Sequence, residues 1–526
     1  MTDTTLTAAA LLMGAAVAAS RVLGYVRDAY IAFAFGAGPA TDAYTAAFTI
    51  PDFLNYALAG GALSITFVPI YTAYLVRGER VERERVFQIV VTTMGLVMGA
   101  GVLVMEATAG WVVPLLVPEF DAAQQALCVH MTRVLLPAQV FFYVGGIVSA
   151  TLYARRHFLA NAAAPLVYNL GILAGGVVLG RWLGVESLAW GAVAGAVVGP
   201  FLLPVIAARR AAAAEDAPDA FRLRVEPGHP GFRRWLVLTI PLMIGFSLTT
   251  ADEWIMRYFA SGVHGAIFRI NLARRLLLVP VAVLGQAAGQ AALPFLARLH
   301  AEGKSEDFGR RTGDALAAVW VLTALAGAWL VALAHPAVDF LYRRGGFGVA
   351  DARATGAVLC IFGLAVPLWG AQAILSRAFY ARQDTWVPML AGTVVTALSV
   401  PLFWAGWRTF GAPGLAAASA LGMGGHVAAL SLLLGRRVPG VVTGAVLGHA
   451  ARGLVVAAAA GAAAWGAAFA ASSVLAPGHV RSLVQLGAGS AAFLPVAVAA
   501  ARLLRVPEVG DLLARAARRF ARKKEP

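Results

Sequence analysis

Ionisable side chains interrupt the first long apolar stretches of this sequence. Arg21, Arg27 and Asp28 lie within the first stretch, and Asp42 opens the second. A charged group inside a lipid bilayer is costly unless it is paired or hydrated, and it therefore marks a candidate functional site. A guanidinium group stays charged and donates hydrogen bonds in a fork that matches phosphate. These residues predict a cationic site that binds an anion.

The spacing of these side chains on a helix favours one shared site. Arg21 and Arg27 are separated by roughly 9 Å along a helix axis. Two guanidinium groups at that distance can hold different parts of one large head group. Arg21 and Asp28 share a helix face and are able to pair. Alternatively, arginines near the end of a span extend their side chains toward the lipid head groups. This interfacial explanation fits Arg21 poorly.

A second group of charges occupies the seventh and eighth apolar stretches. Asp252 and Glu253 lie in the seventh, and Arg269, Arg274 and Arg275 lie in the eighth. We expect Arg275 to contribute to the anion site, whereas Arg269 also fits an interfacial position and Arg274 fits site or scaffold equally. The acidic pair either binds a coupling cation or pairs with the neighbouring arginines, and the sequence leaves both readings open.

The composition places these charges in a membrane. The chain is 60% hydrophobic and 13% charged, against roughly 45–50% and about 25% in soluble domains. Each helical span needs about 20 apolar residues, and only helices satisfy the backbone in lipid where no barrel pattern is present. We therefore predict an all-α integral membrane protein with about fourteen spans. They are expected at 8–35, 43–75, 87–113, 127–153, 159–180, 187–208, 235–259, 265–296, 313–341, 354–380, 386–406, 412–435, 446–472 and 481–503.

Basic residues between the spans predict the orientation. They concentrate in alternate loops, with dense groups at 77–85, 209–234 and 298–311. Cytoplasmic loops carry an excess of arginine and lysine, so we expect both termini in the cytoplasm of a bacterial inner membrane. Arg343 and Arg344 are the exception, because their loop falls on the opposite side. We therefore attribute the net charge of +15 to the basic loops that set the orientation in the membrane. We expect no nucleic-acid partner.

An internal repeat predicts the domain organisation. Tyr153, Ala154 and Arg155 recur as "YAR" at 380–382, and other segments match at nearly the same offset. An even number of spans separates the copies, so the halves are parallel, as in transporters with a central site between two moving lobes. We predict six-helix lobes, two additional spans and a basic cytoplasmic tail. Their expected bounds are 1–220, 221–440, 441–505 and 506–526.

Residue patterns typical of enzymes and metal sites are absent from the sequence. Cys128 and Cys360 form no metal-binding pattern. The "EGKS" segment at 302–305 resembles a phosphate-binding loop, but Arg298 stands where that loop requires glycine. We therefore predict a transporter rather than an enzyme, without a metal or cofactor.

Several motifs resemble one known family. The segment at 20–54 reads "SRVLGYVRDAYIAFAFGAGPATDAYTAAFTIPDFL", and related motifs continue through "LARRLLLVP" at 272–280 and "FYARQDTWVP" at 379–388. They are similar to the MurJ (MviN) lipid II flippases, within the superfamily of multidrug, oligosaccharide-lipid and polysaccharide exporters. The resemblance implies two six-helix lobes with two extra helices. It also implies outward transport of undecaprenyl-pyrophosphate-linked peptidoglycan precursor.

The resemblance also assigns site residues. The family's cavity arginines match Arg21, Arg27 and Arg275, and its aspartate after the GAG turn matches Asp42. Two positions depart from the family: Asn55 stands where many members have arginine, and Gly60 where they often have glutamate. A third departure is Arg274, where an acidic or polar residue is common. The departures leave two alternatives: one cavity cation is relocated from the second span to the eighth, or the protein is a divergent paralogue with another lipid-linked glycan as its substrate.

The expected partners are lipid II, or a similar polyprenyl-pyrophosphate glycolipid, and membrane lipids. We expect a monomer, with cell-wall synthesis proteins as candidate contacts. The leading alternative function is a flippase for another polyprenyl-linked oligosaccharide, such as an O-antigen or exopolysaccharide unit. A multidrug antiporter would require an acidic cavity, and a membrane-bound transferase would require a large catalytic loop. A scaffold protein without transport activity is the last alternative.

Overall fold

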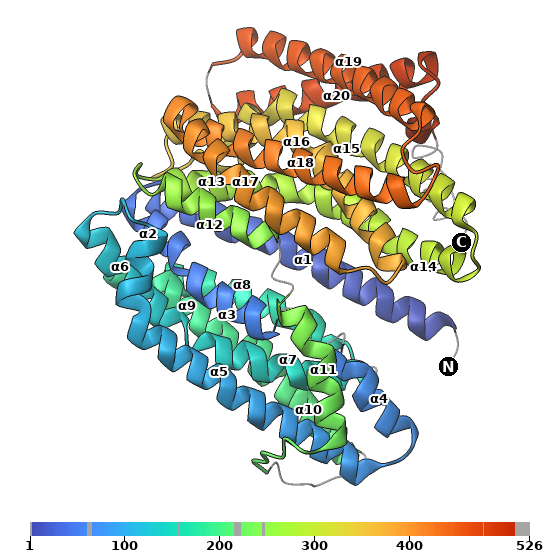
Figure 1. Ribbon diagram of the computed structural model, residues 1–526. Coiled ribbons are helices and arrows are strands. Elements are labelled where there is room, and N and C mark those ends of the chain that lie inside the picture. Colours follow the sequence, from blue (N-terminus) through green and yellow to red (C-terminus); the bar gives the residue numbers. More distant parts are fainter. Residues whose placement is uncertain are drawn as a thin grey trace. The chain divides into compact units, whose positions relative to one another are not determined.

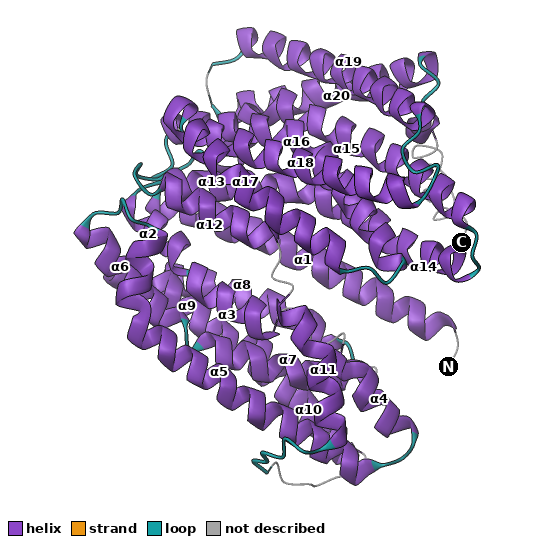
Figure 2. Cartoon of the chain, viewed as in Figure 1, coloured by secondary structure: helices purple, strands orange, loops and turns teal. Residues whose placement is uncertain are grey.

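The computed structural model describes residues 3–59, 66–155, 157–214, 222–244, 248–476 and 478–510. Within these ranges every regular element is a helix (Figure 2). The prediction of an all-α protein is confirmed. Gly60 and the basic tail beyond 510 lie outside the described residues.

The chain divides into two compact units (Figure 1). The first unit comprises Met1–Phe246 together with Ser261–Gly265, and the second comprises Ser247–Ala260 and Ala266–Pro526. The helices of the first unit are α1 (Asp3–Phe35), α2 (Pro39–Ala47), α3 (Thr49–Ala59), α4 (Val68–Val76), α5 (Arg80–Leu116), α6 (Ala122–Leu135), α7 (Ala138–Ala154), α8 (Leu159–Leu183), α9 (Glu186–Ala196), the π-helix η2 (Val197–Leu202), α10 (Leu203–Ala214) and α11 (Pro230–Ile244).

The second unit begins with α12, and its turn toward α13 belongs to the first unit. Its helices are α12 (Leu248–Ala260), α13 (Ala266–Pro280), the π-helix η3 (Val281–Gln286), α14 (Ala287–Ala301), α15 (Ser305–Tyr342), α16 (Val349–Ala381), α17 (Trp386–Phe410), α18 (Ala412–Arg437), α19 (Gly444–Val474) and α20 (His479–Leu503). The last pair, α19 and α20, packs on α15 (Figure 1).

Eleven helical segments among the described residues are long and apolar enough to cross a membrane. The first of these segments begins at Arg80, and the last ends at Leu503. Some of them combine two consecutive helices, as in Ala122–Ala154. The predicted spans at 8–35, 43–75 and 235–259 each include residues that are not fully described. The chain is therefore a multi-pass membrane protein.

Glycines bring α8 and α9 into direct backbone contact. A Cβ atom on Gly191 would lie 2.5 Å from the carbonyl oxygen of Gly171, and one on Gly175 would lie 2.6 Å from the Cα of Gly191. Helix pairs in lipid associate through such small residues, because lipid offers no hydrophobic drive for association. The glycine-rich sequence near 171–199 thus fixes one helix pair of the first unit.

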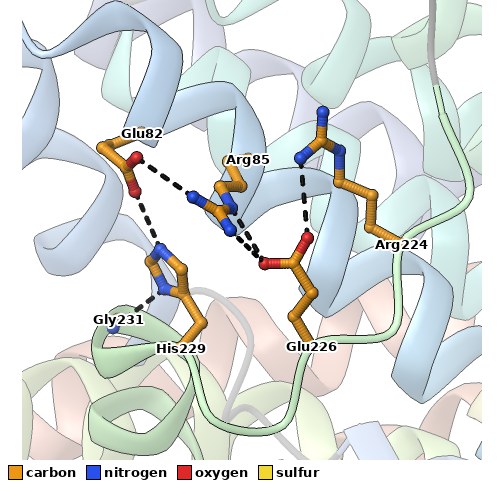
Figure 3. Close-up of polar contacts among 6 residues, drawn as sticks. All are labelled: Glu82, Arg85, Arg224, Glu226, His229 and Gly231. Carbon is orange, nitrogen blue, oxygen red and sulfur yellow. Dashed lines mark hydrogen bonds and ion pairs between the residues drawn. The ribbon is translucent and has the colours of Figure 1, made fainter.

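Residues 222–229, which precede α11, are bound to the start of α5 by polar side chains (Figure 3). Arg85 donates from Nε to Glu226 Oε2 at 2.9 Å, and His229 Nε2 lies 2.8 Å from Glu82 Oε2. The hydrogen bond from Arg85 lowers the pKa of the Glu226 carboxyl below its ordinary value. An ion pair and a histidine–carboxylate contact therefore hold these residues to α5.

We expect Gly191→Val to destabilise the protein by about 1–3 kcal/mol, because the side chain would force α8 and α9 apart. Gly110→Val is the matched control, since no atom lies within 4 Å of a Cβ at that position. Thermal unfolding of the purified variants measures both. Equal unfolding temperatures would contradict the proposed backbone contact.

The Arg85–Glu226 pair should hold the 222–229 segment at neutral pH and release it in acid. Because folding lowers the pKa of Glu226, its contribution is complete above the ordinary value of 4.5 and is lost as the pH falls through the folded value. After correction for the intrinsic pH dependence of amide exchange, the protection of this segment should fall in acid for the parent protein. In Glu226→Gln the protection should already be low at neutral pH, and an unchanged profile would exclude this contact as the anchor.

Candidate functional site

Arg27 is held in a hydrogen-bonded cluster within the first unit. Its side chain and that of Asp28 are buried, with 9% and 3% exposure. Nη2 donates to Asp28 Oδ1 at 2.9 Å, and Nη1 donates to Asn169 Oδ1 on α8 at 2.8 Å. Asn169 in turn donates to the Pro165 carbonyl at 3.0 Å. The guanidinium is therefore oriented by a carboxylate on its own helix and an amide on another.

Arg21 occupies a different environment on the same helix. It lies nearly two turns before Arg27, and its side chain is exposed whereas that of Arg27 is buried. The first helix thus presents one accessible cation and one oriented, buried cation. Both guanidinium groups are of a type that binds anions such as phosphate.

Asp42 anchors a turn. The chain leaves α1 at Gly36, whose φ of 68° is readily adopted only by glycine, and Thr41 caps α2 by accepting from the Gly38 amide at 2.9 Å. The Asp42 side chain is 1% exposed and accepts a hydrogen bond from the Gly265 amide. Asp42 therefore holds the 261–265 turn to α2.

Asn55 is paired with another amide. Its Nδ2 donates to Gln139 Oε1 on α7 at 3.0 Å, and both residues belong to the first unit. An uncharged amide pair thus occupies the position at which arginine was expected from the family pattern.

Arg274 joins the acidic pair of the second unit. Nη1 donates to Asp252 Oδ2 at 2.6 Å, and Nε lies 3.2 Å from Glu253 Oε1. Ser419 donates to Asp252 Oδ2 at 3.0 Å, and the Arg274 guanidinium carbon lies 5.6 Å from the centre of the Trp369 ring. With only 7% of Arg274 exposed, this cluster fixes α12, α13, α16 and α18 to one another.

The other two arginines of α13 differ in their contacts. Arg269 donates from Nη1 to Asp351 Oδ1 on α16 at 2.9 Å. The two side chains form an ion pair that joins α13 to α16. Arg275 is half-buried, and its Nε donates to Asn271 Oδ1 at 2.8 Å. The side chain of Arg275 is therefore partly accessible, whereas that of Arg21 on α1 is exposed.

The structure thus places Arg27, Asp42, Asn55, Arg269, Arg274 and Arg275 in separate contacts, each within one unit. Their uncharged partners Asn169, Gln139, Asn271 and Ser419 were missed, although amides and hydroxyls in apolar stretches are themselves a signal of helix contacts. Among the described residues no group of histidine, cysteine and carboxylate side chains could hold a metal ion.

The chain is a multi-pass helical membrane protein with buried, paired charges. Its fold is similar to that of an inward-facing multidrug MATE transporter, with a TM-score of 0.62 and 15% identity, covering 80% of this chain and 94% of that one. The structure titled "Lipid II flippase MurJ, inward closed conformation" is similar with a TM-score of 0.74 and 21% identity, covering 94% and 99%.

Sequence comparison identifies the family. The model of the lipid II flippase MurJ family matches residues 31–495. The probable lipid II flippase MurJ of Rhizobium tropici is 30% identical over 409 residues, covering 75% of each chain. The lipid II flippase MurJ of Burkholderia cenocepacia is 30% identical over 436 residues, covering 80% of this chain and 82% of the relative. The chain belongs to the MurJ family.

We expect Arg274→Ala to destabilise the protein by about 3–5 kcal/mol, because Asp252 and Glu253 would be left without their shared cation. Asn55→Ala should cost only about 1 kcal/mol, since it removes one hydrogen bond between neutral groups. Adding Asp252→Asn to Arg274→Ala should restore part of the lost stability. Thermal unfolding in detergent measures all three, and full stability of Arg274→Ala would rule out the cluster as an anchor.

Proposed function

We propose that this protein moves lipid II, the undecaprenyl-pyrophosphate-linked peptidoglycan precursor, from the cytoplasmic to the periplasmic leaflet of the bacterial inner membrane. Membership of the MurJ family supports this assignment. The observation that carries it is the oriented guanidinium of Arg27, which Asp28 and Asn169 hold and which lies on the same helix as the exposed Arg21. A diphosphate is the part of lipid II that such groups bind.

The proposed sequence of events follows from the different exposure of the arginines. Within the first unit Arg21 meets the diphosphate first, because its side chain is accessible, and in the second unit the half-buried Arg275 is the candidate phosphate-binding cation. Arg27 then binds more deeply, and the carboxylate of Asp28 balances its charge whenever the substrate is absent. Asn169 is a positioning residue, since it fixes the direction in which Arg27 donates.

The proposed architecture has fourteen spans. Eleven candidate spans lie among the described residues, and α1, the segment from α2 to α4 and the segment from α11 to α12 supply three more. The internal repeat relates two six-helix lobes in parallel, with α19 and α20 as an additional pair. Such lobes support alternating access, with both termini in the cytoplasm.

The energy source in this proposal is the membrane potential or an ion gradient. The guanidinium of Arg274 already occupies the space between Asp252 and Glu253. A coupling cation that binds this pair would therefore have to displace Arg274. The alternative that the pair serves only as a structural partner requires no such movement.

Arg27→Ala should abolish growth of a strain depleted of its own lipid II flippase, because the oriented guanidinium is lost. Arg27→Lys should also fail, since an ammonium cannot bond Asp28 and Asn169 as the fork does. Lipid II should accumulate in the inner leaflet while the variant is inserted at normal abundance.

The matched control is Arg133→Ala, an exposed arginine of α6 that donates to the Glu106 carbonyl. It should support normal growth. Growth of the Arg27 variants would remove the site assignment. Accumulation of a different polyprenyl-linked glycan, with normal lipid II turnover, would support the alternative substrate class instead.

A further inference from the structure

A cavity beside the last two helices is apolar along most of its length. It measures about 790 Å³ and lies among α15, α16, α19 and α20, all of which belong to the second unit. Alanine, valine and leucine side chains line it, together with Trp465 and Phe469, which are 60% and 63% exposed. A cavity of this lining is suited to hydrocarbon rather than to a sugar or a phosphate.

The apolar cavity ends at a basic one. His335, Pro336, Arg481 and Gln485 line both this cavity and a second of about 520 Å³. The basic cavity lies where α15 ends, α16 begins and α20 begins. The two cavities therefore form one continuous site with an apolar part and a polar mouth.

Positive charge dominates the polar mouth. Arg343, Arg353 and Arg481 line it, and Asp339 is its only carboxylate among the described lining residues. Arg343 is already committed, since its Nε donates to Asp339 Oδ1 at 2.7 Å. The same carboxylate accepts a hydrogen bond from Ser482. The charges of Arg353 and Arg481 thus exceed the acidic charge available at the mouth.

The walls of this site are fixed by specific contacts. Trp329 donates from Nε1 to Ser490 Oγ at 3.0 Å, which joins α15 to α20. Glycines allow close approach, because a Cβ on Gly489 would lie 2.6 Å from Leu333 Cδ2 and one on Gly461 would lie 3.3 Å from Ala328 Cβ. The site is therefore a formed feature of the second unit.

We propose that this site binds an anionic diacyl phospholipid of the membrane, with its phosphate at Arg353 and Arg481 and an acyl chain along Trp465 and Phe469. Basic pockets between membrane helices recognise anionic head groups in this way. The proposal also accounts for Arg343, whose loop departs from the expected distribution of basic residues. With the orientation proposed above, the lipid belongs to the periplasmic leaflet.

The test is native mass spectrometry of the purified full chain with phosphatidylglycerol and phosphatidylcholine of identical acyl chains. The parent protein should retain phosphatidylglycerol more strongly. Arg353→Gln combined with Arg481→Gln should weaken phosphatidylglycerol binding roughly tenfold or more, because two charges near the phosphate are removed. Phosphatidylcholine binding should change far less.

The matched control is Arg181→Gln combined with Arg408→Gln. It removes two exposed arginines that lie near the ends of α8 and α17 and stack on Trp182 and Trp404. This control should leave phosphatidylglycerol binding unchanged. An equal loss in the control, or no loss in the Arg353 and Arg481 variant, would overturn the proposal.

Two further measurements separate the parts of the site. Ala462→Trp fills the apolar cavity and should weaken retention of both phospholipids while the arginines remain. Inorganic phosphate should displace phosphatidylglycerol no better than chloride at equal ionic strength. Stronger displacement by phosphate would indicate a simple anion site and would overturn the proposal, as would unchanged retention in Ala462→Trp.

Discussion

The cost of an unpaired charge in hydrocarbon governs how this protein is built. Each buried arginine described here is met by a carboxylate: Arg27 by Asp28, and Arg274 by Asp252 and Glu253. Neutral groups complete these clusters, because Asn169 and Ser419 satisfy hydrogen bonds that water would otherwise supply. Buried charges are thereby made compatible with a stable helical unit.

The same requirement separates anchors from binding groups. Asp42 and Arg269 are bound to the Gly265 amide and to Asp351, so their charges are used in holding turns and helices together. Arg21 is exposed and Arg275 is half-buried. In the proposed function Arg21 meets the diphosphate, and the oriented Arg27 then binds it.

Small residues decide where helices approach closely. In the first unit they join α8 to α9, and in the second they bring α19 and α20 against α15. The second contact leaves an apolar cavity with a basic mouth rather than a filled interface. A bound phospholipid there would stabilise the additional helix pair, which lies outside the internal repeat.

The sequence by itself determined the helical membrane class, most of the spans and the family, because apolar length and local motifs are properties of consecutive residues. It also singled out Arg27, Asp28 and Arg274, which are buried, and the acidic pair Asp252 and Glu253, which is partly exposed. Only the tertiary structure decided their partners: Asp28 and Asn169 for Arg27, Gly265 for Asp42, and Asp252 and Glu253 for Arg274. The physical reason is that most of these pairings join residues far apart in the chain, and their geometry depends on how the helices pack.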